Sequence, residues 1–226
     1  RRILGELFGD FKRGGSMFDS VLSDDAKATL ALLNKSGLVK DAYLAGGSAL
    51  ALHFGHRYSI DFDFFSPFAF DPIKLSKSLS NIGSFVEEVA KGISLIGTFQ
   101  GIKMSYFQYD YPLIDKTEPF LGIALAHPHD IAAMKLVAIT DRGTKKDFID
   151  LYELVHQGIS FDEMFALYDR KYKLFEANRF TLIKALSYLD EADRDVMPQM
   201  ARAMNWEEVK KFFTAESMRL AKKYLE

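Results

Sequence analysis

The chain has 226 residues, of which 48% are hydrophobic and 27% charged, and its formal net charge is −2 at pH 7. This composition is typical of a globular protein, and the near-neutral charge excludes a general electrostatic attraction to nucleic acid. The absence of cysteine excludes disulfides and thiolate metal sites, and no apolar run approaches the roughly 18 residues of a membrane span. We therefore expect a cytoplasmic protein without a membrane partner.

The first part of the chain is predicted to alternate between helices and strands. We give residues 1–16 little weight, because the Gly-rich stretch before Met17 is compatible with an artificial extension. Ser23 followed by two aspartates predicts a helix start, and Gly37 predicts its end. The further expected elements are strand 41–45, helix 48–54, strand 59–65, helix 72–79 and strands 93–99, 102–109 and 120–126.

The rest of the chain is predicted to be helical. Helices are expected from Pro128, over 146–155, from the capping box at Ser160, and from Asn205 to about Leu225. The sequence thus predicts an α+β (α/β) fold. A mixed sheet flanked by helices would occupy residues 17–126, and an all-helical region, residues 127–226, would pack on it.

Two acidic residues interrupt the most apolar predicted strand. Because side chains alternate between faces, Ile60, Phe62 and Phe64 are expected on one face and Asp61 and Asp63 on the other. The two carboxylates would be about 6.5 Å apart along the strand. Such a pair suits one divalent cation, or two about 4 Å apart, and Mg²⁺ or Mn²⁺ is the expected metal. A solvated strand face is the alternative interpretation.

Gly46, Gly47 and Ser48 lie between a predicted strand and a predicted helix. Glycines at a helix N-terminus let backbone N–H groups approach a phosphate, and Ser48 would add a hydroxyl. The alternative is a tight turn in which Ser48 is the helix N-cap. The order of glycine turn, helix and Asp-x-Asp strand favours a phosphate site beside a metal site.

These stretches resemble a known family. Residues 44–52 (LAGGSALAL), 55–57 (GHR) and 59–65 (SIDFDFF) are similar to the AbiEii/AbiGii toxin family of the DNA polymerase beta-like nucleotidyltransferases. The similarity continues in residues 130–136 (DIAAMKL) and 142–152 (RGTKKDFIDLY). The resemblance implies the nucleotidyltransferase fold, a nucleoside triphosphate (NTP) as substrate, and a toxin of a toxin–antitoxin or abortive-infection pair with a cognate antitoxin.

A second group of candidate residues lies in the helical region. Lys135 shares an apolar helix stripe with Ile131, so its stem could pack on the core while its amine reaches water. Alternatively the amine counters charge on a leaving pyrophosphate, and the resemblance favours this role because the family places a functional lysine in this motif. Arg142 is a further candidate for the phosphates. The resemblance assigns a catalytic role to Asp147, with Asp150 as a candidate partner of Lys135 or Arg142. Favourable helix-dipole and i, i+4 contacts are the alternatives for the two acids.

Arg57 and Ser105 raise two further questions. Arg57 precedes the Asp-x-Asp strand and is a candidate phosphate or nucleotide contact, with a salt-bridge anchor as the alternative. Many superfamily members place a third metal-binding carboxylate on a neighbouring strand, where this chain has Ser105, with Asp110 only at the strand's end. Either Asp147 supplies the third carboxylate, or the site has no third carboxylate. In the second case nucleotidyl transfer would be slow, or the protein would only bind a nucleotide.

The histidines show no zinc-binding spacing and are interpreted as surface or capping residues: His53, His56, His127, His129 and His156.

The predicted function is Mg²⁺-dependent transfer of a nucleoside monophosphate (NMP) from an NTP to an acceptor, either an RNA such as tRNA or a protein. Asp61 and Asp63 would hold the metal, and Lys145 and Lys146 could meet an RNA backbone. Two alternatives remain, a small-molecule acceptor as in antibiotic nucleotidyltransferases, and a non-catalytic protein that binds a nucleotide or a partner.

Overall fold

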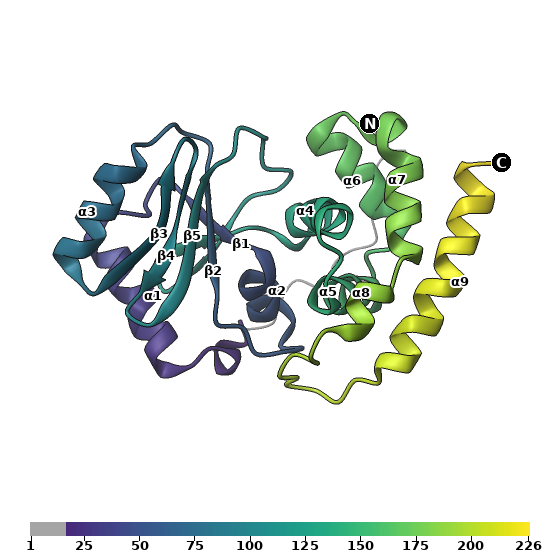
Figure 1. Ribbon diagram of the computed structural model, residues 1–226, viewed down its shortest axis with the longest axis horizontal. Helices are drawn as coiled ribbons and strands as arrows, with labels where there is room; N and C mark the ends of the chain where they lie inside the picture. Colours follow the sequence, from purple (N-terminus) through teal and green to yellow (C-terminus); the bar gives the residue numbers. More distant parts are fainter. Residues whose placement is uncertain (1–16) are drawn as a thin grey trace. The chain divides into compact units, whose positions relative to one another are not determined.

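A computed structural model describes residues 17–226, which form two compact units, Met17–His127 and Pro128–Glu226 (Figure 1). Residues 1–16, given little weight above, lie outside the described residues. None of the helices described in residues 17–226 combines the length and apolar character that crossing a membrane requires.

The first unit is a seven-stranded sheet with helices. After a short 3₁₀ turn (Asp19–Val21), the helices are α1 (Asp24–Ser36), α2 (Gly46–Phe54) and α3 (Pro72–Ile82). The strands are β1 (Tyr43–Ala45), β2 (Phe62–Ser66), β3 (Phe85–Lys91), β4 (Ser94–Phe99), β5 (Ile102–Gln108), β6 (Glu118–Phe120) and β7 (Ile123–Leu125). As predicted, the Ser23 side chain accepts a hydrogen bond from the Ala26 N–H, and α1 ends at Gly37.

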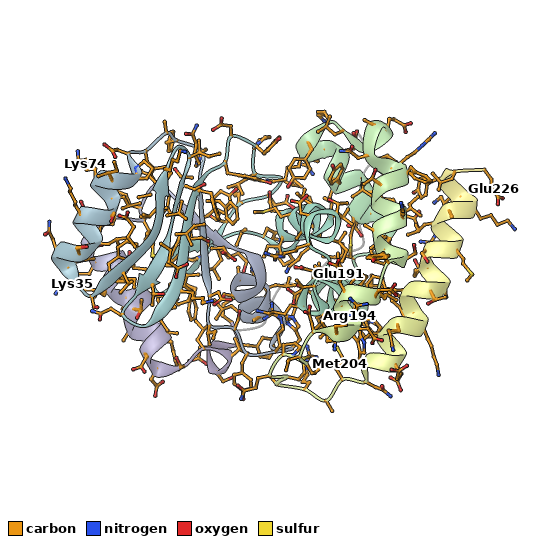
Figure 2. All side chains as sticks on the ribbon, in the orientation of Figure 1. Lys35, Lys74, Glu191, Arg194, Met204 and Glu226 are labelled. Atoms are coloured by element: carbon orange, nitrogen blue, oxygen red, sulfur yellow. The ribbon has the colours of Figure 1, made fainter. Side chains whose placement is uncertain are left out.

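The sheet is mixed, which confirms the predicted fold class. Its strand order is β3-β4-β5-β2-β1-β7-β6. The β1–β7 and β2–β5 pairs are parallel and the other four are antiparallel. Figure 1 shows α1 and α3 on the side of the sheet away from α2. On the outer sides of α1 and α3, exposed residues such as Lys35 and Lys74 point into solvent (Figure 2).

Strand β2 is shorter than the predicted strand 59–65. Pairing with β1 stops where Ala45 faces Asp63, because the chain then turns into α2, and pairing with β5 begins at Phe62. Phe62 and Phe64 are fully buried as expected, but Ile60 lies outside the sheet and is 64% exposed. The assignment of Ile60 to the core was therefore wrong.

Two other parts of the sheet differ from the prediction. The expected single strand 120–126 is a hairpin of β6 and β7, because Leu121 and Gly122 both adopt positive φ angles and reverse the chain. Strand β3 was missed, since it is an edge strand whose mostly exposed side chains include Glu87 and Glu88.

The second unit is helical throughout its regular structure, as predicted. It contains α4 (Pro128–Asp141), α5 (Lys145–His156), α6 (Phe161–Tyr172), α7 (Phe175–Ser187), α8 (Asp190–Arg194) and α9 (Trp206–Tyr224). Helices α7 and α8 were not predicted individually. Aromatic rings join α5, α6 and α9: the Phe148 and Phe213 centroids are 4.8 Å apart, and those of Phe161 and Phe213 are 5.8 Å apart. A fully buried ion pair, Lys171–Asp130 at 2.7 Å, joins α6 to α4.

Candidate active site

The two glycines after β1 are required by the side chains that lie against them. Gly46 begins α2 with a φ of 65°, and a Cβ atom there would lie 2.6 Å from Oδ2 of Asp63. A Cβ atom on Gly47 would collide with the guanidinium of Arg57. The absence of side chains at Gly46 and Gly47 therefore lets Asp63 and Arg57 approach the N-terminus of α2. The backbone dipoles of a helix favour negative charge there.

Ser48 lies inside α2 and is buried, so the alternative that made it the helix N-cap is wrong. Its hydroxyl donates a hydrogen bond to the backbone carbonyl of Asp61 and is 2.9 Å from the Ser59 hydroxyl. These contacts join α2 to the segment that leads into β2. The assignment of Ser48 to phosphate binding stays a prediction.

Asp61 and Asp63 flank the buried Phe62 at the start of β2, and both acids are half-buried. Oδ1 of Asp63 accepts a hydrogen bond of 2.5 Å from the Ser105 hydroxyl, while Oδ2 faces Gly46. The hard oxygen atoms of two neighbouring carboxylates suit a divalent cation. The donor set therefore fits Mg²⁺ or Mn²⁺.

Ser105 is the direct register partner of Asp63 in the parallel β2–β5 pair. This is the place on a neighbouring strand where a third carboxylate was sought. Asp110 lies beyond the end of β5, where it accepts a hydrogen bond from Gln108. The sequence showed that Ser105 replaces the acid found in many superfamily members. It did not show that the Ser105 hydroxyl donates a hydrogen bond to Asp63 and orients it.

Arg57 is only 4% exposed, although arginine is rarely buried. Its Nη1 atom lies 3.3 Å from the Tyr58 carbonyl oxygen and 3.4 Å from the Ser59 hydroxyl. A fixed positive charge thus stands beside Gly47 at the start of α2, a place suited to an anion. Its phosphate-binding role stays a prediction.

Lys135 is buried in an ion cluster of the second unit. Its Nζ atom lies 2.9 Å from Oδ1 of Asp147 and 2.6 Å from Oδ2 of Asp150. Because the amine is bound by two fully buried carboxylates, the alternative in which it reaches water is wrong. Asp150 is a partner of Lys135, as expected.

Asp147 uses both carboxylate oxygens within its own unit. Arg142 donates to them from Nε and Nη2 at 2.9 and 3.0 Å, and the Thr144 hydroxyl donates at 2.7 Å. Burial by itself raises the pKa of Asp147, but Lys135, Arg142 and Thr144 together hold that pKa well below its ordinary value. Asp147 is therefore ionised and holds two cations. Arg142 is the exposed member of the cluster, with 61% of its side chain accessible.

Lys145 does not have the solvated position expected of an RNA contact. It is buried, its amine donates to the backbone carbonyl of Asp195, and it lies 5.0 Å from the centroid of the Trp206 ring. Lys146 is exposed. The interpretation of Lys145 as an RNA contact is therefore wrong.

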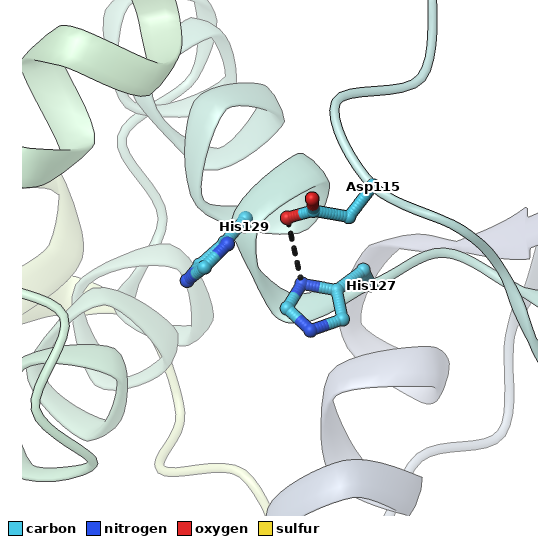
Figure 3. Close-up of side chains that lie close together, drawn as sticks. All are labelled: Asp115, His127 and His129. Carbon is cyan, nitrogen blue, oxygen red and sulfur yellow. Dashed lines mark ion pairs between the residues drawn. The ribbon is translucent and has the colours of Figure 1, made fainter. Parts of the chain in front are cut away.

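Two of the histidines are more buried than expected. His56 is fully buried, so its assignment to the surface was wrong. His53 is half-buried, and its Nε2 atom is 2.9 Å from the carbonyl oxygen of Ala126. His127 directly precedes α4, and its Nδ1 atom lies 3.5 Å from Oδ2 of Asp115 (Figure 3).

Comparisons with known proteins agree on one family. The model of the family described as "Nucleotidyl transferase AbiEii toxin, Type IV TA system" matches residues 29–115 and 93–222. An uncharacterised protein of Aquifex aeolicus (strain VF5) is 37% identical over 210 residues, which are 91% of this chain and 98% of that protein. The crystal structure of JHP933 from Helicobacter pylori has the same fold, with a TM-score of 0.54 and 20% identity over 89% of this chain and 94% of that one. The chain therefore belongs to the AbiEii toxin family and is a nucleotidyltransferase.

Proposed function

We propose that this protein transfers an NMP from an NTP to an RNA, such as tRNA, or to a protein, and that the reaction depends on Mg²⁺ or Mn²⁺. The observation that carries the proposal is the position of Asp63, held between Gly46 at the start of α2 and Ser105 on β5. This position brings a carboxylate whose oxygen atoms suit a divalent cation next to an anion-attracting helix N-terminus in one unit.

Residues of the first unit would bind and orient the triphosphate. Asp61 and Asp63 would hold the cation, which, when bound, supplies Lewis-acid polarisation of the phosphates. The N–H groups of Gly46 and Gly47 would attract phosphate oxygens together with Arg57. An acceptor hydroxyl would lose its proton to solvent and attack the α-phosphorus as the bond to the bridging α–β oxygen breaks and pyrophosphate leaves.

Lys135, Arg142 and Asp147 are proposed to be required for the same reaction, because the family motif contains them. Burying Lys135 with two carboxylates costs desolvation energy that a purely apolar contact would avoid. Arg142 would counter negative phosphate charge, since most of its side chain is exposed. Asp147 is a poor base because its pKa is lowered, so we assign it the positioning of Lys135 and Arg142 rather than removal of the acceptor proton.

The biological role we propose is that of a toxin with a cognate antitoxin. The family description names a toxin of a type IV toxin–antitoxin system. An antitoxin would then act on this protein or on the consequences of its reaction.

The test is transfer of label from each of the four α-labelled NTPs to total RNA, protein and small acceptors in Mg²⁺. We expect label on RNA or protein, no transfer after EDTA treatment, and at least about 100-fold slower transfer in Asp63→Asn. Asp110→Asn is the control, because Asp110 is an acid of the same unit beyond the end of β5.

Three results would contradict the proposal. Label on small acceptors alone would indicate the antibiotic-type enzyme, and NTP binding without any transfer would indicate a non-catalytic protein. Equal loss of transfer in Asp110→Asn would show that Asp63 has no special role.

A further inference from the structure

A row of aromatic side chains continues from Asp63 along the same face of the sheet. Phe65 follows Asp63 by two residues in β2, and Phe107 follows Ser105 by two residues in β5. The register pairs Asp63 with Ser105 and Phe65 with Phe107. Because alternate residues of a strand share a face, both rings lie on the face of Asp63, about 6.5 Å further along.

The rings contact one another in sequence. The centroids of Phe65 and Phe107 are 5.7 Å apart, those of Phe65 and Tyr109 are 5.1 Å apart, and those of Tyr109 and Tyr111 are 5.0 Å apart. We call Phe65, Phe107, Tyr109 and Tyr111 the aromatic row. Tyr43 of β1 is buried and stacks against Phe65 from the neighbouring strand, which fixes that end of the row.

The aromatic row is not an ordinary core. Phe62 and Phe64 on the opposite face of β2 are fully buried, whereas Phe65, Phe107 and Tyr109 are only half-buried and Tyr111 is 42% exposed. Partly exposed, mutually packed rings beside a carboxylate are a surface on which a flat ligand can stack.

We propose that the aromatic row binds the nucleobase of the NTP whose phosphates are held at Asp61 and Asp63. The inference rests on the proposed function. A nucleotide has a charged end and a flat aromatic end, and this face offers a polar site and a stacking surface in the same order along β2 and β5. Every nucleobase has a π-face, so the row by itself accepts all four NTPs with similar affinity.

The experiment compares binding of NTPs with binding of inorganic tripolyphosphate, both with Mg²⁺, by calorimetry on the full chain. One stacked base contributes about 5- to 150-fold in affinity. We therefore expect the wild-type protein to prefer NTP by such a factor, and Phe65→Leu and Phe107→Leu to lose that preference while tripolyphosphate binding is unchanged. Phe65→Tyr keeps an aromatic ring and should therefore keep the preference for NTP. Phe68→Leu, in an exposed phenylalanine that follows β2, leaves it intact.

Tyr111→Leu is the second variant if a change in β2 or β5 impairs folding, since Tyr111 is exposed and lies beyond β5. An unchanged NTP preference in folded Phe65→Leu and Tyr111→Leu overturns the inference. So does a result in which RNA binding falls while NTP binding does not, because the row then serves the acceptor. Failure of the proposed function looks different: tripolyphosphate binding is then absent from the wild-type protein or insensitive to Asp63→Asn.

Discussion

The two oxygens of the Asp63 carboxylate have different surroundings. Oδ1 accepts the hydrogen bond from Ser105, and Oδ2 lies so close to Gly46 that a Cβ atom there would be only 2.6 Å away. A serine in this place adds a hydrogen bond without adding negative charge. The acid pair thus has a net charge of −2 rather than the −3 of a three-carboxylate site, and it needs less countercharge to bind a triphosphate.

Ser105→Ala removes the group that orients Asp63. Because partners that orient metal ligands typically contribute 10- to 100-fold in metal affinity, we expect the Mn²⁺ affinity to fall by about 10-fold or more. Ser105→Thr keeps the hydroxyl and should bind Mn²⁺ like the wild type. Electron paramagnetic resonance of bound Mn²⁺ measures this without turnover. Equal Mn²⁺ affinity in Ser105→Ala and wild type would show that the hydrogen bond does not position the ligand.

At the scale of elements, helices α4 and α5 are joined by a cluster of two cations and two carboxylates. Lys135 comes from α4, Arg142 follows its last residue, and Asp147 and Asp150 come from α5. The cluster fixes the α4–α5 turn because each charge is stabilised only while its partners are in place.

Asp147→Asn should lower the free energy of unfolding by about 3 kcal/mol, since it leaves the buried Lys135 with one carboxylate fewer. The pKa of Asp147 is lowered in the folded protein, so this stabilisation is present above the ordinary carboxyl pKa of 3.8 and is lost as the pH falls below it. Urea unfolding at pH 7 measures the difference. Asp141→Asn, an exposed acid at the end of α4, is the control and should change stability by less than about 0.5 kcal/mol.

The elements that the sequence predicted well begin with local signals. Ser23, Asp71, Ser160 and Asn205 each accept a backbone hydrogen bond at a helix start, as short-range capping requires. Strand ends were predicted less well, because a strand ends where the neighbouring strand stops pairing with it, and the neighbouring strand is distant in sequence. Ile60 is apolar enough for a core strand, yet β1 has no residue left to pair with it.

At the scale of the whole molecule, the two units differ in how they use charge. In the first unit Asp63 and Arg57 lie against the start of α2, and a helix N-terminus attracts anions. In the second unit, several acids form ion pairs with lysines and arginines. Asp162 at the start of α6, for example, contacts Arg219, Lys223 and Tyr224 of α9.

The Asp162 cluster predicts how the second unit responds to acid. Partial burial by itself raises the pKa of Asp162, but its contacts with Lys223, Tyr224 and Arg219 lower that pKa to about 2. The stabilisation is therefore present above pH 3.8 and is lost as the pH falls towards about 2. We expect Asp162→Asn to be about 1 kcal/mol less stable than wild type at pH 7, because solvent screens these contacts, and equally stable near pH 2.

Trp206 makes this measurement specific. It is the only tryptophan in the sequence and lies in α9, so its fluorescence during urea unfolding reports on residues 128–226. Asp141→Asn again serves as the control. A stability difference between Asp162→Asn and wild type that does not shrink between pH 7 and pH 2 would contradict the assigned pKa.

The sequence alone determined the family, the mixed fold and the starts of the helices that have a side-chain cap, because these depend on motifs and on contacts between residues close in the chain. It also placed Asp63 on the opposite face of β2 from Phe62 and Phe64, since alternation along a strand is a local property. The sequence did not show the partners of Asp147, the candidate third acid. In the structure Arg142 donates to both of its carboxylate oxygens.

Only the tertiary structure decided which distant residues meet. Ser105 reaches Asp63 because β2 and β5 pair in parallel across 42 residues of sequence, and the same register aligns Phe65 with Phe107. Burial of Arg57 against Gly47, and of Lys135 between two carboxylates, likewise follows from packing. Strand register and burial arise from long-range contacts, and no local pattern in one sequence specifies them.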